Sequence, residues 1–176
     1  MQTLFTIGHS TREIDEFIDL LKAHAITTLV DIRTIPKSRH NPQYGQEELE
    51  GSLREHGIEY AYIKSLGGLR PVSKHSINDA WRNKSFRNYA DYMQTDDFKQ
   101  GLRELLKLSQ DATVAIMCAE TVPWRCHRSL VADALLVRGV PVCEIISEGN
   151  EREHKLTPFA VVQGSEITYP KSALES

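Results

Sequence analysis

Residues 116–128 gather several reactive side chains into one short segment. Two of the three cysteines of the chain lie there with a histidine, two arginines and a carboxylate: Cys118, Glu120, Arg125, Cys126, His127 and Arg128. A strand-like apolar run precedes the segment and a helix-like run follows it. Backbone amides and a helix N-terminus at such a junction lower the pKa of a thiol and favour its thiolate. Cys118 is therefore a candidate nucleophile, with a buried structural cysteine as the alternative.

Three cationic residues fall in the expected first turn of the helix that follows, namely Arg125, His127 and Arg128. Cations at that end of a helix oppose its dipole, so we expect an anion to compensate them. The anion is either a ligand phosphate or an acid of the chain such as Glu120 or Asp31. Guanidinium groups hold phosphate well because they donate in a planar fork. The segment therefore predicts an anion site.

Polar residues also follow the other predicted strands. His9 and Ser10 follow the first, Asp31 and Arg33 follow the second, and the third leads to Gly67-Gly68 and Arg70. Ligands bind beyond the carboxyl ends of the strands in open α/β sheets, so we expect these residues at one edge.

Each of these residues has a functional and a structural interpretation. His9 is a candidate acid/base or phosphate contact, or a loop histidine bonded to a carbonyl. Asp31 either pairs with Arg33 or orients a catalytic group. Arg70 is a candidate lid residue, and Arg39 adds a cation in the long loop at 33–45. Glu120 is expected to orient a histidine.

Five apolar, strand-like runs alternate with helical patterns. We expect strands at 4–7, 28–32, 58–63, 113–117 and 140–146, and a hairpin from 159–162 to 166–169. Ser10 to Glu13 matches a capping box before a helix at 14–21. The pattern predicts a three-layer, Rossmann-like α/β domain with a mainly parallel five-stranded sheet and helices on both faces. We expect one domain over 1–176, with a core at 1–160 and a hairpin or tail at 161–176.

Composition excludes some classes of protein. The formal net charge is only -3, so no global field attracts nucleic acid or a membrane surface. No apolar run approaches the roughly 20 residues that span a bilayer. An odd number of cysteines without an export signal predicts free thiols, a reducing compartment and a cytoplasmic location.

A metal site is one alternative, with Cys118, Cys126, His127 and His9 as its ligands. Structural zinc sites usually contain a closely spaced cysteine pair, which this chain lacks, so we expect no metal. The second alternative is a module that binds a nucleotide or nucleic acid through its basic loops without turnover. The sequence indicates no particular cofactor or oligomeric state.

Several separated motifs resemble the domain of unknown function 488 family. They are Thr6 to Ser10, Val30 to Arg39, Leu66 to Gly68, and Cys118 to Glu120 with Cys126 to Arg128. The resemblance extends from the first strand to His154. It implies a compact α/β domain, found mostly in bacteria and archaea, whose family has no settled activity.

The residues together favour an enzyme, a thiol-dependent hydrolase or transferase, that acts on a phosphate-bearing small molecule or a nucleic-acid end. The expected catalytic groups are Cys118, His9, His127, Asp31 and Glu120. The expected anion contacts are Arg33, Arg39, Arg70, Arg125, Arg128 and Ser10.

Overall fold

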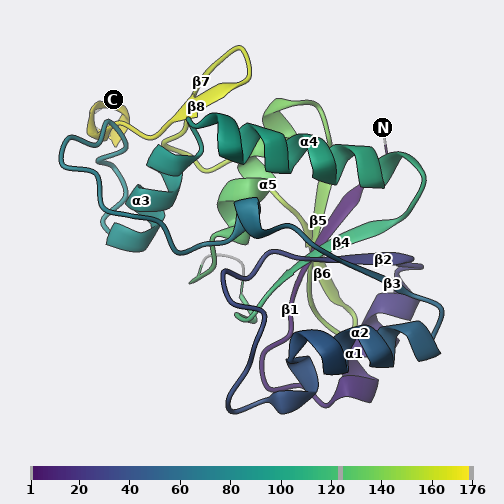
Figure 1. Cartoon of the computed structure of the whole chain (residues 1–176). Helices are drawn as coiled ribbons and strands as arrows, with labels where there is room; N and C mark the ends of the chain where they lie inside the picture. The colour runs from purple at the N-terminus through teal and green to yellow at the C-terminus, as the bar shows by residue number, and fades with distance from the viewer. Residues whose placement is uncertain (1, 123–124, 175–176) are drawn as a thin grey trace.

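The computed structural model describes residues 2–122 and 125–174 and contains a six-stranded sheet in the order β3-β2-β4-β1-β5-β6 (Figure 1). The first five strands in chain order are parallel where they pair. Their bounds are β1 Leu4–Gly8, β2 Thr28–Asp31, β3 Glu59–Tyr62, β4 Val114–Cys118 and β5 Val142–Ser147. All residues of β2 and β4 are buried, which explains their continuous apolar sequence.

Helices cover both faces of this sheet (Figure 1). One face packs on α1 (Ile14–Ala23) and α2 (Gln46–Glu55), and the other on α3 (Lys84–Tyr92), α4 (Asp96–Gln110) and α5 (Arg128–Val137). Alternation along the strands divides the core: Val30 belongs to the α3–α5 layer and its neighbour Leu29 to the α1–α2 layer. The fold is thus the expected three-layer α/β arrangement.

A sixth strand, β6 (Asn150–Glu153), is antiparallel to β5 and was not predicted. Its residues are all exposed, so it carries none of the apolar signal that marks a strand. The chain reaches it through Gly149, whose positive φ of 71° suits a tight turn. The predicted hairpin is confirmed, as β7 (Val161–Gln163) pairs with β8 (Glu166–Thr168).

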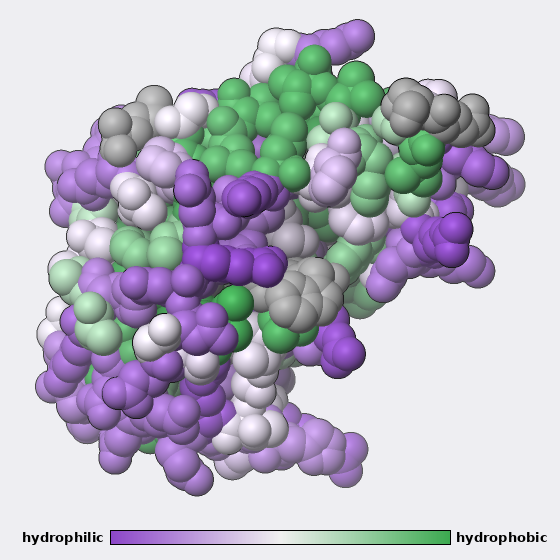
Figure 2. Space-filling model, turned by 180° about the vertical axis from the view of Figure 1, so that it is seen from behind, coloured by the Kyte–Doolittle hydropathy of each residue, from purple (hydrophilic) through white to green (hydrophobic). Residues whose placement is uncertain are grey.

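Short 3-10 turns complete the description: η1 (Pro42–Tyr44), η2 (Lys64–Leu66) and η4 (Lys171–Leu174). Hydrophilic side chains cover much of the lower part of the face in Figure 2, and hydrophobic ones gather toward its top. No helix in the described part of the chain is both long and apolar enough to cross a bilayer.

The predicted capping box before α1 is wrong. The helix begins at Ile14 behind Glu13, and no side chain caps it. Ser10 instead has a positive φ of 51°, and its amide donates to the carbonyl of Ala119. The segment after β1 therefore follows the β4 loop before it turns into the helix, which leaves Ser10 too early to cap it.

A buried ionic cluster attaches the C-terminal segment to the domain. His154 lies between Glu144 of β5 and Asp133 of α5, and its Nε2 is 2.8 Å from Asp133 Oδ1. Asp133 also accepts hydrogen bonds from the Thr157 and Tyr169 hydroxyls. Burial alone lowers the pKa of His154, but bonding to the two carboxylates outweighs it and raises the pKa to about 9.

This cluster predicts a loss of stability in mild alkali. Because the folded-state pKa of His154 is raised, its contribution is fully present below about pH 6.5 and is lost as the pH rises through about 9. The shift corresponds to at most about 3 kcal/mol of unfolding free energy. Urea unfolding at several pH values checks this. A His154→Gln variant should lose much of the decline, and parallel curves for the two proteins would contradict the assignment.

Candidate active site

Some of the predicted residues lie together at the point where the chain leaves two neighbouring strands toward opposite faces of the sheet. β1 and β4 are neighbours, with Gly8 opposite Cys118 at their carboxyl ends. The helix after β1, α1, packs on one face of the sheet, whereas the helix after β4, α5, packs on the other (Figure 1). Such a switch point separates the two loops and is the usual binding crevice of open α/β sheets.

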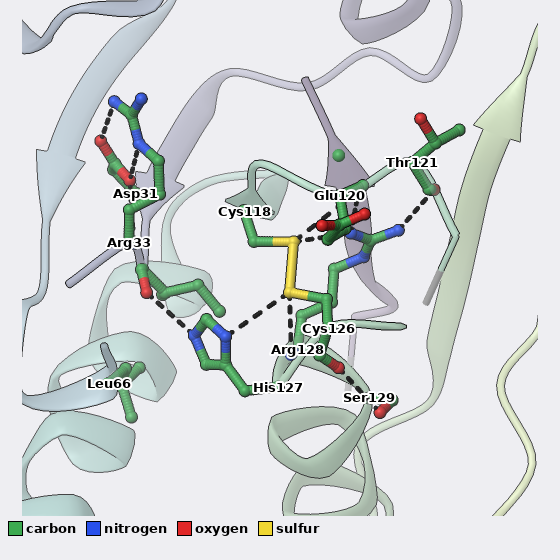
Figure 3. The surroundings of a disulfide bond; sticks show 12 residues. Asp31, Arg33, Leu66, Cys118, Glu120, Thr121, Cys126, His127, Arg128 and Ser129 are labelled. Carbon is green, nitrogen blue, oxygen red and sulfur yellow. Dashed lines mark hydrogen bonds and ion pairs between the residues drawn. A yellow bond between two sulfur atoms is a disulfide. The ribbon is translucent and has the colours of Figure 1, made fainter. Parts of the chain in front are cut away.

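Cys118 and Cys126 are joined by a disulfide at this point (Figure 3). This corrects the expectation of free thiols, since Cys143 on β5 is the free cysteine of the described residues. Cys118 ends β4 and Cys126 lies just before α5, so the loop between them returns to its starting point. The path of this loop brings the two sulfurs together. The spacing of the cysteines in the sequence does not indicate that pairing.

The guanidinium of Arg128 contacts the loop after β4 from its buried side. Its side chain has no exposed surface, and Nη1 lies 2.7 Å from Cys118 Sγ. Nη1 also donates to the carbonyl of Glu120, and Nη2 donates to that of Thr121 at 2.7 Å. Buried loop atoms already bind the guanidinium of Arg128, which leaves it no exposed surface for the expected ligand contact. Burial lowers its pKa to about 10, which leaves it charged at neutral pH.

Gly8 makes room for this arrangement. A Cβ atom built there would lie 1.4 Å from the carbonyl oxygen of Glu120 and 2.9 Å from Nη1 of Arg128. Only glycine therefore lets the loop carbonyl and the guanidinium approach the end of β1.

His127 lies beside Cys126 and is held in one tautomer. Its Nε2 is 2.9 Å from the carbonyl oxygen of Ile32, which can only accept, so Nε2 carries the proton. Burial lowers the pKa of His127 to about 4, with a further contribution from the charge of Arg128, so the ring is neutral at pH 7. The unprotonated Nδ1 lies 3.5 Å from Cys126 Sγ and is available to accept a proton.

The ring of His127 packs against the backbone of the glycine pair. A Cβ atom at Gly68 would lie 2.6 Å from its Nδ1, so Gly68 is needed for this contact. The predicted glycine turn thus positions the imidazole.

An open pocket of about 330 Å³ borders these groups. Its lining includes predicted site residues from two junctions, after β2 and after β4, namely Arg33, Cys118, Glu120, Arg125, Cys126 and His127. Arg125 is exposed. Glu120 serves the site through its carbonyl oxygen, which Arg128 binds, so the expected contact from its carboxylate to a histidine is not observed.

Asp31 and Arg33 form a buried ion pair that lies apart from the disulfide in Figure 3. Arg33 Nε and Nη2 donate to the carboxylate at 2.9 and 2.7 Å, and the Tyr60 hydroxyl donates to it at 2.6 Å. Nη1 of Arg33 is buried and has no hydrogen-bond partner among the described residues. Arg33 also lines the pocket, but its charge is paired with Asp31.

His9 lies on the other face of the sheet from the cysteines. Its side chain follows Ile7 toward the α1–α2 layer and stacks on Tyr44, whereas Cys118 follows Ile116 toward α5. Nδ1 of His9 lies 2.8 Å from the Ser10 carbonyl, so the structural interpretation of this histidine is the one observed.

The expected metal set is not assembled. His9 and His127 each turn one ring nitrogen to a backbone carbonyl and lie on opposite faces. Within residues 2–122 and 125–174, no group of three or more histidine, cysteine or carboxylate side chains is arranged to hold a metal.

The remaining predicted anion contacts lie outside the pocket lining. Arg70 stacks on Tyr92, with its guanidinium carbon 3.6 Å from the ring centre, and donates to the Gly67 and Lys64 carbonyls. These bonds attach it to its own loop, away from the pocket, and the lid stays a prediction. Arg39 is exposed on the loop before η1, and Ser10 bonds the β4 loop through its backbone.

Sequence reasoning missed Arg12. Its guanidinium donates to the carbonyls of Gly8 and Ile146, beyond the carboxyl ends of β1 and β5. Its own carbonyl accepts from the Tyr44 hydroxyl at 2.8 Å. Because Arg12 lies within the predicted capping box, the sequence pattern indicated no other role for it. The available signal was a cation within four residues of the end of β1, because strand-end carbonyls need donors.

A model of the family described as Domain of unknown function DUF488 matches residues 13–135, more than half of the 176-residue chain. The matched range contains Cys118, Cys126, His127 and Arg128. No curated protein and no solved structure matches the chain.

A Gly8→Ala substitution tests the packing of the site. The added methyl group must displace the Glu120 carbonyl and Arg128, so we expect a loss of about 2–3 kcal/mol in unfolding free energy. The control is Gly51→Ala, because Gly51 lies within α2 with no atom near its Cβ position. It should be neutral or stabilising by up to about 1 kcal/mol. Equal melting curves for the two variants would contradict the packing described.

Proposed function

We propose that this chain, which belongs to the DUF488 family, is a thiol-dependent hydrolase or transferase that acts on a phosphate-bearing ligand. In this proposal the reduced Cys118 is the nucleophile and the pocket beside it holds the ligand. The enzyme works with its disulfide reduced, so a reducing compartment such as the cytoplasm suits it.

The observation that carries the proposal is the contact between Arg128 and Cys118. A fully buried guanidinium is costly unless an opposite charge or several hydrogen bonds compensate it. Glu144 attracts the charge of Arg128, but its carboxylate pairs with Arg152 and His154, and no carboxylate of the described residues forms a salt bridge with Arg128. Cys118 Sγ lies 2.7 Å from its Nη1. After reduction, the thiolate of Cys118 is the anion that matches this cation. The site therefore favours the reactive form of the cysteine.

The charges around the pocket support an anionic ligand. Arg125 is exposed at its lining, and Arg33, paired with Asp31, also lines it. A volume of about 330 Å³ lies within the range of pockets that hold small molecules. Phosphate suits guanidinium donors because each of its oxygens accepts hydrogen bonds.

His127 supplies a proton acceptor in this scheme. It is neutral at pH 7 and keeps Nδ1 free of a proton, beside the sulfur pair. Attack by the Cys118 thiolate on the bound ligand would form a covalent intermediate, which water or a second substrate would then release. His127 would take the proton from that second nucleophile, directly or through one water.

Alkylation tests the reactive thiolate. Reduced protein is treated with iodoacetamide between about pH 5.5 and 9.5, and each cysteine is followed by peptide mass spectrometry. We expect Cys118 to reach half-maximal reactivity at least about one pH unit below that of an ordinary thiol near 8.5. Cys143 is the internal control, since burial and nearby Glu151 and Glu144 raise its pKa.

An Arg128→Met variant should bring the reactivity profile of Cys118 up to that of an ordinary thiol. If Cys118 and Cys143 of the unmodified chain titrate together, the nucleophile assignment is wrong, whatever the variant does.

Ligand binding tests the pocket. In a thermal-shift screen of nucleotides and phosphorylated metabolites, a ligand of the native state raises the melting temperature by mass action. We expect Arg125→Ala to reduce that shift by more than half, and Lys107→Ala, exposed on α4 and outside the pocket lining, to leave it unchanged.

The same hits are then assayed for turnover with Cys118→Ser. Binding without any turnover by the unmodified protein would indicate a binding module, and silence across all phosphorylated compounds would contradict the anionic ligand.

A further inference from the structure

We propose that Cys118 and Cys126 form a redox pair that reduces hydroperoxides, with Cys118 as the cysteine that is oxidised and Cys126 as the one that resolves it. The inference rests on the Cys118 thiolate of the proposed function but not on its phosphate-bearing ligand. It adds a second activity to the same site.

The first observation is that each sulfur has its own activating group. Cys118 Sγ lies 2.7 Å from Nη1 of Arg128, which stabilises a thiolate. Cys126 Sγ lies 3.5 Å from the unprotonated Nδ1 of His127 and 3.5 Å from the backbone nitrogen of Arg128 at the start of α5. The two cysteines are thus different, one paired with a cation and one with a base.

The second observation is that the two sulfurs lie together in the structure. They are joined across the loop, and both cysteines, 2% and 5% exposed, lie in the wall of the open pocket. Oxidation-sensitive cysteines combine a favoured thiolate, access for small molecules and a neighbouring resolving thiol. Cys143 has a raised pKa and no partner cysteine, so it lacks both the favoured thiolate and the resolving thiol.

The chemistry balances in two steps. The Cys118 thiolate attacks one peroxide oxygen, the oxygen–oxygen bond breaks, and the leaving alkoxide takes a proton from solvent to become an alcohol or water. Cys118 is then a sulfenic acid.

In the second step Cys126 gives its proton to Nδ1 of His127 and attacks the sulfur of Cys118. The sulfur–sulfur bond forms, the sulfur–oxygen bond breaks, and the hydroxide leaves as water with the proton from His127. A low-molecular-weight thiol returns the pair to its reduced state by thiol–disulfide exchange.

The test exposes the reduced full-length protein to a small excess of hydrogen peroxide at pH 7 and follows intact mass with time. We expect the unmodified protein to lose the mass of two hydrogen atoms, with Cys118 and Cys126 in one cross-linked peptide. A Cys126→Ser variant should instead gain the mass of one oxygen atom, trapped by dimedone on Cys118. A Cys118→Ser variant should show neither change.

The matched control is Cys143→Ser, which should form the cross-link at the rate of the unmodified protein. Peptide mapping of the unmodified protein decides the question even if a variant does not fold. Absence of the 118–126 cross-link there would overturn the redox pair.

The outcomes separate the two proposals. If Cys118 is alkylated at low pH but forms no cross-link with peroxide, only the redox pair fails. If the cross-link forms and no phosphorylated compound binds, only the phosphate-bearing ligand fails.

Discussion

The positive charge of Arg128 lies inside the protein, and the surrounding groups are arranged to stabilise it. Two loop carbonyls and the sulfur of Cys118 surround the guanidinium, and Gly8 leaves the space through which they approach. Each group also fixes something else: the carbonyls set the path of the loop after β4, and the sulfur lies at the pocket. The path of the loop therefore depends on one buried charge, and in the proposed function the reactivity of Cys118 depends on the same charge.

The switch point of the sheet explains why this charge lies beside a pocket. The helices after β1 and β4 leave toward opposite faces, so the loops at the carboxyl ends of these strands diverge. On one face the opening contains the cysteines, His127 and Arg128. On the other, His9 stacks on Tyr44. The candidate chemistry thus belongs to the face of α5, and the opposite face stabilises the strand ends.

The sequence was sufficient for the layers, the five parallel strands and the edge that carries the site, because buried strands and helical spacing leave strong apolar patterns. It did not separate the two faces at that edge. Two-residue alternation relates His9 to Ile7 and Cys118 to Ile116, but nothing in the sequence states which face each helix covers.

Other errors have a local cause. Val131 and Leu135 follow Arg128 at helical spacing. This spacing indicates that Arg128 lies on the buried stripe of α5, whereas the prediction was a ligand contact. The pairing of Cys118 with Cys126 depends on a loop path, and β6 depends on edge pairing by polar residues. Neither leaves a periodic signal.

The central claim is that Cys118 is a thiolate at neutral pH because Arg128 is its counter-ion. The most direct measurement is the ¹³Cβ chemical shift of Cys118 in reduced, cysteine-labelled protein, followed from acidic to alkaline pH. The account predicts that Cys118 gives the shift of a thiolate already at pH 7, while Cys143 still gives that of a thiol. A Cys118 resonance that changes only together with that of Cys143, in the alkaline range, would contradict it.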